Sequence, residues 1–115
     1  MSNWLEAYTA FEAARGAETN YERTEWLPAY QTAQSGGPDI PENVDVKMDQ
    51  LLELRCEAEE ALIATAAPDL MSAIWKIEYS RNRWKEFEAW PDKWWSDVLA
   101  DLHRLANVDE RISVS

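Results

Sequence analysis

Five carboxylates of this sequence are spaced so that they could bind a basic surface. They are Asp45, Asp49, Glu53, Glu57 and Glu60, and we call them the acidic ridge. On a helix, residues four positions apart lie about 6 Å apart along the axis, and all five fall within about 120° of arc. Like charges at this spacing destabilise an isolated helix by about 0.2–0.5 kcal/mol per pair. The acidic ridge therefore either attracts a basic surface of a partner protein, such as a nucleic-acid channel, or forms a solvated outer face.

Seven Trp residues are the second unusual feature of the composition. Four of them surround one predicted turn: Trp84, Trp90, Trp94 and Trp95. Trp84 and Trp94 fall on predicted core faces. Trp90 lies in the turn and Trp95 at the edge of an apolar stripe. Either these two aromatic rings fill a small core, or they stay exposed as anchors for a partner.

Charged residues interrupt the predicted apolar faces. Arg55 lies within the stripe of one helix, and Arg81 and Glu88 lie within the stripe of the next. Because an unpaired buried charge is costly, we expect these residues to form an ion-pair network at a seam between helices, with acids such as Glu59 or Glu78. A pocket or a homodimer seam is the alternative interpretation.

Patterns that would indicate catalysis, a metal or a cofactor are weak. The only His, His103, has Ala100 where a di-iron bundle would place Glu. One His and one Cys, Cys56, cannot form a structural zinc site. Residues 36–38, Gly-Gly-Pro, lack the Lys and Ser/Thr of a phosphate-binding loop. We therefore predict no enzyme activity, no metal and no cofactor, and a Cys56–His103 pair is the alternative that would make the protein an enzyme.

The elements that must position these residues are predicted to be helices. Trp4, Tyr8 and Phe11 share a face with Trp26 and Tyr30. This favours one helix over residues 3–34, kinked near Pro28; a break at Gly16 is the alternative. Further helices are predicted over residues 41–66, 69–89 and 91–107.

Each later helix carries an apolar stripe and a boundary signal. The stripes are Val44, Met48, Leu51, Ala58 and Leu62; Leu70, Ile74, Ile77 and Trp84; and Trp94, Trp95, Val98, Leu99, Leu102, Leu105 and Ala106. Pro41 and Pro91 are suited to first helical positions, Asp69 is a good N-cap, and Asn107 is a reasonable end.

Short links favour antiparallel neighbours. The predicted fold is an all-α antiparallel bundle of three long helices plus a shorter C-terminal helix. Residues 1–107 form a single domain, and residues 108–115 form a loose C-terminal tail.

Composition and charge narrow the function. The chain has 115 residues and a formal net charge of −11. Residues 1–60 contain 13 acids and 4 bases, whereas residues 61–115 contain 9 and 7. This acidity argues against direct binding to nucleic acid or to an anionic membrane surface. A single Cys, no predicted membrane span and no signal peptide favour a cytoplasmic protein.

Three stretches resemble short, acidic, Trp-rich helical proteins of bacterial prophages and mobile elements. They are Ala67-Pro68-Asp69-Leu70, Trp75-Lys76-Ile77-Glu78-Tyr79 and Trp90-Pro91-Asp92-Lys93-Trp94-Trp95. The resemblance spans about half the chain, from Ile40 to about Leu105, and transfers no functional residue. It implies a phage or prophage setting, where small acidic proteins include inhibitors of host defence nucleases such as anti-CRISPR proteins. We therefore expect a non-enzymatic module that binds a basic protein surface; a self-associating structural protein, such as a homodimer, is the alternative.

Overall fold

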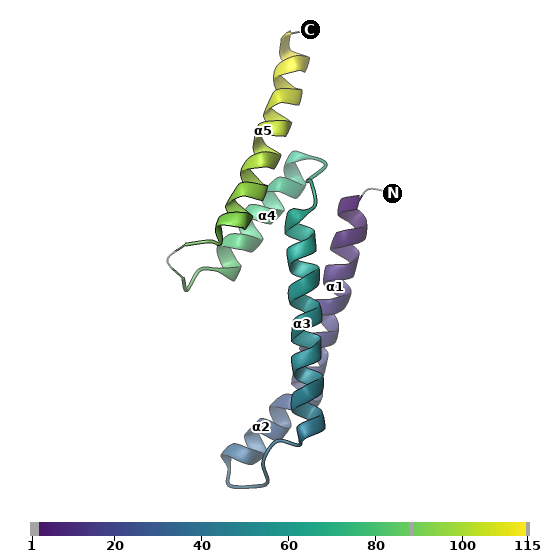
Figure 1. The fold of residues 1–115 in the computed structure, drawn as a ribbon, viewed down its shortest axis with the longest axis vertical. Helices are drawn as coiled ribbons and strands as arrows, with labels where there is room; N and C mark the ends of the chain where they lie inside the picture. Colours follow the sequence, from purple (N-terminus) through teal and green to yellow (C-terminus); the bar gives the residue numbers. More distant parts are fainter. Residues whose placement is uncertain (1–2, 88, 115) are drawn as a thin grey trace. The chain divides into compact units, whose positions relative to one another are not determined.

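The computed structural model describes residues 3–87 and 89–114, and the side chains of residues 3–87 and 89–107. The helical elements are α1 (Asn3–Tyr21), a π-helical segment η1 (Glu22–Trp26), α2 (Leu27–Gln34), α3 (Glu42–Ala64), α4 (Leu70–Arg83) and α5 (Asp92–Val114) (Figure 1). No strand occurs in this described part of the chain. The predicted all-α class is therefore confirmed.

The first three elements form one continuous helical stretch from residue 3 to residue 34. Pro28 lacks an N–H and its ring crowds the carbonyl four residues before it, so the regular α-helical pattern cannot continue there. Before Pro28 the chain forms the π-helical segment η1, in which the Leu27 N–H donates to the Glu22 carbonyl, five residues back. Figure 1 shows the change of direction between α1 and α2. The kink predicted near Pro28 is confirmed, and the alternative break at Gly16 is wrong because Gly16 lies inside α1.

The loop after α2 begins with glycines for a geometric reason. Gly36 has a φ of 87°, and its N–H donates to the Ala33 carbonyl, while the Gly37 N–H donates to the Thr32 carbonyl. This pair of bonds is the Schellman pattern that ends many helices. A Cβ on Gly37 would lie 2.7 Å from the Thr32 side chain, so this glycine permits a close approach.

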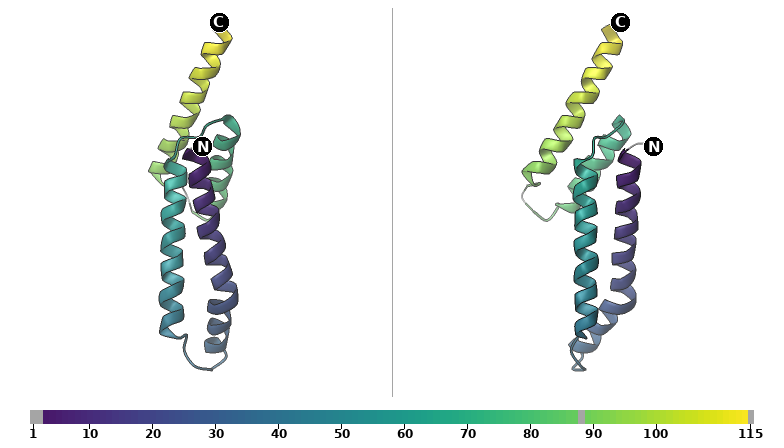
Figure 2. Two further views of the ribbon diagram at one scale, coloured as in Figure 1. Left: turned by 90° about the vertical axis from the view of Figure 1, so that its right-hand side faces the viewer. Right: turned by 45° about the vertical axis from the view of Figure 1, so that its right-hand side comes forward.

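The chain divides into two compact units. The central unit is residues 6–61, and the terminal unit is residues 1–5 together with residues 62–115. In the central unit, α1 and α3 lie side by side and antiparallel (Figure 2): Glu18 pairs with Arg55, and Trp26, at the end of η1, contacts Asp45 near the start of α3. Phe11 is fully buried there. The single domain predicted for residues 1–107 stays a prediction, as does a bundle that includes all the helices.

In the terminal unit, α4 and α5 form an antiparallel hairpin. Lys76 pairs with Asp101 at mid-length, and the Trp84 and Trp94 rings meet edge to face, with centroids 5.3 Å apart, beside the connecting loop. The buried apolar side chains of this unit are Leu62, Ile63, Ala67, Ala73, Trp94 and Val98.

The packing face of α4 differs from the predicted one. Leu70 and Ile74 are exposed, whereas Ala73, Lys76 and Ser80 are buried. The helix is rotated from the predicted face so that Lys76 reaches its acidic partner, Asp101, on α5. The apolar stripe alone carried no sign of this rotation.

Several boundaries also need correction. The α4 helix ends at Arg83, not near Ala89, because the Phe87 N–H bonds the Trp84 carbonyl in a turn. The α5 helix is not shorter: it has 23 residues, as α3 does, against 14 in α4. It continues past Asn107, since Asn inside a helix costs less than about 1 kcal/mol and no Gly or Pro follows. The backbone of residues 108–114 therefore belongs to α5, and their side chains lie outside the described part.

Candidate partner-binding surface

The acidic ridge lies on the exposed side of α3. All five side chains, Asp45, Asp49, Glu53, Glu57 and Glu60, are exposed. Within the central unit, Arg55 of α3 points instead toward α1, where it meets Glu18. At 100° per residue the ridge begins about 80° away from Arg55 and extends further from it. Apart from Asp45 at its start, the ridge is thus directed away from α1.

The ridge carboxylates lack counter-charges. Among the described residues, no basic side chain forms an ion pair with Asp49, Glu53, Glu57 or Glu60. Unpaired like charges repel, so the row adds nothing to the stability of α3. It does produce a local negative potential that can attract a basic partner.

Asp45, at the start of the ridge, is held by an aromatic side chain. The Trp26 Nε1–H donates to Asp45 Oδ1 over 3.2 Å. Trp26 in turn stacks on Tyr30, with ring centroids 5.0 Å apart and an interplanar angle of 13°. The π-helical segment therefore positions one end of the ridge through its last residue.

Apolar side chains are interspersed with the ridge. Val46 falls inside its arc and Leu52 at its edge, and both are exposed. Protein interfaces combine apolar contacts with charged ones, so this mixture suits a protein partner.

Arg55, predicted to lie in a seam, does so within the central unit. Its Nε donates to Glu18 Oε1 over 2.9 Å and its Nη1 donates to Glu59 Oε2 over 3.2 Å. Desolvation disfavours the guanidinium cation, but the hydrogen bond and charge of Glu18, with the charge of Glu59, outweigh it and raise the pKa of Arg55. This cluster joins α1 to α3, which is a structural role.

The other two predicted seam residues do not join that cluster. Arg81 is exposed on α4, where it lines a shallow polar hollow with Glu78, Asn82 and Lys85. Glu88 lies outside the described residues. Among the described residues, the part of the predicted network that occurs is the cluster around Arg55, and Arg81 does not join it.

The two predicted aromatic anchors lie together. Trp90 and Trp95 stack with centroids 4.3 Å apart and an interplanar angle of 18°. Trp95 is exposed and Trp90 is half-buried. Trp94 is buried, so neighbouring residues of α5 have opposite environments.

His103 and Cys56, the pair that would have indicated an enzyme, lie on two different helices. His103 is exposed on α5, and Cys56 is half-buried on α3. No group of three His, Cys, Asp or Glu side chains that could hold a metal ion occurs in the described residues.

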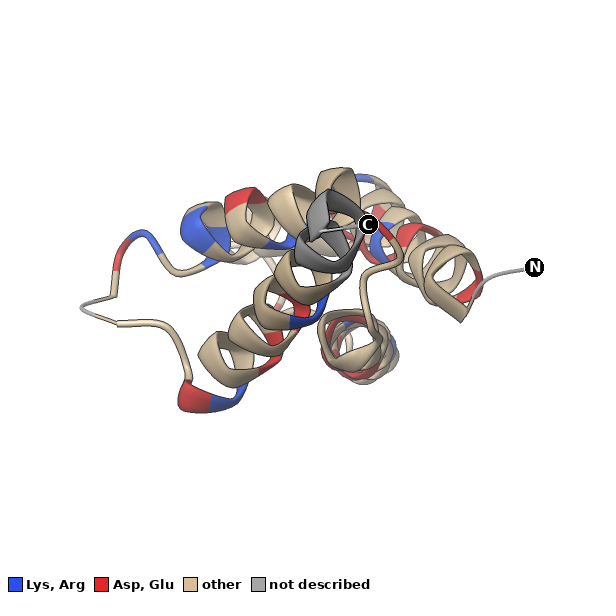
Figure 3. Cartoon of the chain, turned by 90° about the horizontal axis from the view of Figure 1, so that it is seen from above, with Lys and Arg blue, Asp and Glu red and all other residues tan. Residues whose placement is uncertain are grey.

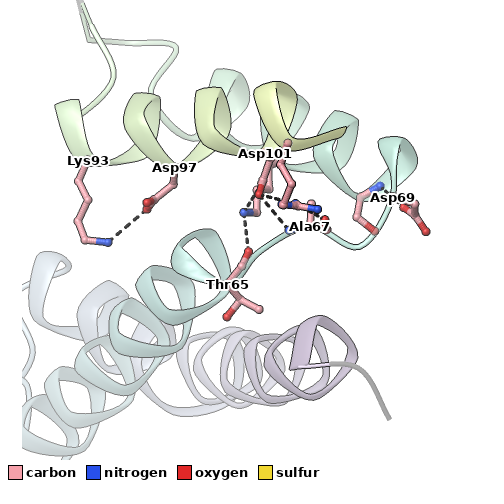
Figure 4. A network of polar contacts seen from close by, with 9 residues as sticks. Thr65, Ala67, Asp69, Lys93, Asp97 and Asp101 are labelled. Carbon is pink, nitrogen blue, oxygen red and sulfur yellow. Dashed lines mark hydrogen bonds and ion pairs between the residues drawn. The ribbon is translucent and has the colours of Figure 1, made fainter. Parts of the chain in front are cut away.

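A buried ionic network in the terminal unit escaped the sequence analysis. Lys76 Nζ donates to Asp101 Oδ2 and to the Thr65 carbonyl, each over 2.6 Å (Figure 4). Asp101 Oδ1 accepts from the Ala67 N–H over 3.1 Å and from Arg104 Nη2 over 3.0 Å. Arg104 Nη2 also donates to the Ala67 carbonyl.

The Trp4 ring completes the surroundings of this network, with its centroid 5.5 Å from Lys76 Nζ. The network ties the turn after α3 to both α4 and α5, which is a structural role. A signal for Asp101 was present in the sequence, because it follows Trp94 and Val98 at core spacing, seven and three residues later.

None of the helices in the described part of the chain combines the length and the apolar composition of a membrane span. In comparisons with known proteins, no family model, curated protein or solved structure matches the chain.

Proposed function

We propose that this protein is a non-enzymatic interaction module that binds a basic surface of a partner protein through the acidic ridge. The observation that carries the proposal is the row of exposed carboxylates without counter-charges on α3. Such a row weakens the isolated helix, so a benefit to folding does not explain it. A complementary basic surface would convert the repulsion into attraction and speed association.

The exposed Val46 and Leu52 sharpen the proposed partner class. A bound metal ion requires converging oxygen ligands, whereas carboxylates about 6 Å apart along a helix form a line. A line of charge with apolar contacts suits an extended protein surface. The partner is thus a folded protein with a row of Lys or Arg side chains.

In its most specific form, the proposal describes an anti-defence inhibitor of phage or prophage type, acting in the cytoplasm. Its target is a nuclease whose basic channel normally holds nucleic acid. A row of carboxylates presents that channel with the regularly spaced negative charge that a phosphate backbone presents. The test of this form is whether the protein inhibits cleavage by the captured nuclease, and whether the ridge variant described next fails to inhibit it.

Affinity capture from host lysate tests the general proposal. The ridge variant carries Asp49→Lys, Glu53→Lys and Glu57→Lys. The control carries Glu22→Lys, Glu25→Lys and Asp39→Lys, which changes the net charge equally at exposed positions outside the ridge. We expect the wild type and the control to retain a protein with a basic surface and the ridge variant to lose it. Equal retention by all three proteins, or equal loss from both variants, would overturn the proposal.

Self-association is a second candidate function. The observation in its favour is the number of exposed large apolar side chains on α4 and α5, including Leu70, Ile74, Trp95 and Leu99.

A further inference from the structure

An apolar strip on the α4–α5 hairpin has no cover within the terminal unit. It consists of Leu70, Ile74 and Ile77 on α4, and Trp95, Leu99 and Leu102 on α5. Four of these side chains, Leu70, Ile74, Trp95 and Leu99, are between 37% and 55% exposed, and the other two are half-buried. We call this set the hairpin strip.

Both halves of the strip lie on the same side of the hairpin. The facing sides of the two helices are marked by the Lys76–Asp101 and Tyr79–Trp94 contacts, and the buried Ala73 and Ser80 lie on the same side of α4 as Lys76. At 100° per residue, the α4 members of the strip lie about 40–100° beyond Ala73, and the α5 members lie about 80–140° beyond Trp94. Because the helices run in opposite directions, rotation in the same sense along each chain turns toward the same side of the pair.

The register of the hairpin makes the strip continuous. Lys76 is level with Asp101, and Trp84 is level with Trp94. In that register Ile74 comes next to Leu102, and Ile77 next to Leu99. The strip therefore runs along the hairpin for most of the length of α4, which is about 20 Å for its 14 residues.

The charges beside the strip favour a second copy of this chain as its cover. Two copies with a net charge of −11 repel one another over most of their surfaces. The edge of the strip differs, because Arg81 on α4 and Lys85 in the turn after α4 lie beside it together with Glu78. Figure 3 shows blue at the C-terminal end of α4, and a blue band followed by a red one on the loop that comes next. On the α5 edge, the exposed Asp92 is the first residue of the helix, at the same end of the hairpin as this turn.

We propose that two copies of this chain associate through the hairpin strip about a two-fold axis parallel to the hairpin. The axis stacks α4 of one copy over α5 of the other, so the contact is isologous. Arg81 then faces Trp95 of the second copy, where a guanidinium over an indole ring is favourable. Lys85 faces the acidic Asp92 of the second copy. The hairpin strip of each copy covers that of the other, and the acidic ridge is not required for this contact.

Light scattering coupled to size-exclusion chromatography tests the proposal on the full chain. We expect the wild type to have twice the mass of one chain at high concentration, and Leu99→Asp to have the mass of one chain with unchanged helical circular dichroism. The matched control is Leu54→Asp, an exposed leucine on α3, which should stay dimeric. A wild type that stays monomeric at every concentration, as it would if another part of the chain or a different protein covers the strip, would overturn the proposal.

If the Leu99→Asp variant does not fold, an exchange of charges between positions 85 and 92 tests the dimer instead. Lys85→Asp alone should weaken dimerisation at least tenfold, and adding Asp92→Lys should restore it. Failure of the double variant to dimerise better than the single variant would contradict the two-fold arrangement. The ridge variant should stay dimeric, which separates this proposal from the proposed function.

Discussion

The two units each contain an ionic cluster that joins helices, and the clusters differ in their access to water. In the terminal unit, the Lys76 and Asp101 side chains are 1% and 5% exposed. In the central unit, the Arg55 and Glu18 side chains are 15% and 13% exposed. Stability should therefore depend more strongly on the charges of the terminal unit, because removing one partner from a dry pair leaves a charge that water cannot solvate.

The carboxylates of the acidic ridge are more accessible to water than either of these clusters. Its side chains are exposed, and four of its five carboxylates have no polar partner in the described part of the chain. Carboxylates of this protein therefore divide into those that hold helices together, such as Asp101 and Glu18, and those that face outward. Substitutions in these two groups of carboxylates should change the free energy of unfolding in opposite directions.

Asp101→Leu should have the largest effect. It leaves the Lys76 ammonium buried without an acid and the Ala67 N–H without its acceptor, so we expect a loss of about 3–5 kcal/mol, measured by urea unfolding. The double variant Lys76→Met/Asp101→Leu should recover at least about 1 kcal/mol of this loss, since no buried charge remains in the pair. A double variant as unstable as the single one would contradict a dry ion pair.

Arg55→Met should have a smaller effect. Water reaches this cluster in part, so the loss should be about 2 kcal/mol, the range for hydrogen bonds to charged groups. Arg15→Met is the matched control, because Arg15 pairs with Glu12 on the exposed side of α1. The control should change stability by less than about 0.5 kcal/mol. If both variants lost the same amount, burial would not be what distinguishes the Arg55 cluster.

Neutralising the acidic ridge should raise the free energy of unfolding, whereas the previous substitutions lower it. Asp49→Asn, Glu53→Gln and Glu57→Gln together remove like-charge repulsion, so stability should rise by about 0.2–0.5 kcal/mol per pair. The gain should shrink in high salt, which screens exposed charges. A loss of stability, seen as a lower urea midpoint, would show that the ridge carboxylates serve the fold.

The cap of α4 gives a pH-dependent effect. The Asp69 side chain accepts from the Ser72 N–H over 2.8 Å, and this hydrogen bond lowers the pKa of Asp69 below its ordinary value. A lowered folded-state pKa means that the stabilisation is present above the ordinary value and is lost as pH falls through the lowered one. Asp69→Asn keeps a capping oxygen without this titration, so it should lose less stability than the wild type on acidification, measured by urea midpoints across acidic pH. Identical acid dependence of the two proteins would contradict the prediction.

Local signals allowed the helices to be predicted, but not all of their packing faces. Asp69 caps α4 as predicted, and Pro28 changes the helix type where the kink was expected. These signals act within a few residues. The face that α4 buries depends instead on the ion pair between Lys76 and Asp101, which lies 25 residues later. The spacing of residues within α4 does not indicate this partner.

The candidate site shows the same limit. The spacing of the ridge was sufficient to predict that these carboxylates lie on the solvent-exposed face of α3. The helix period alone puts charged residues at four-residue intervals on one face, and no contact with another element is needed to hold them there. The stacking of Trp90 on Trp95 and the hydrogen bond from Trp26 to Asp45 were not predictable, since each depends on loop or helix geometry between the residues.

The most direct test of partner binding by the acidic ridge is a titration of the captured partner. Its affinity is measured for the wild type, the ridge variant and the control with three reversed charges elsewhere. We predict that the ridge variant binds at least tenfold more weakly, while the control stays close to the wild type and both remain folded. Equal affinities for the ridge variant and the wild type, or equal losses in the two variants, would contradict binding through the ridge.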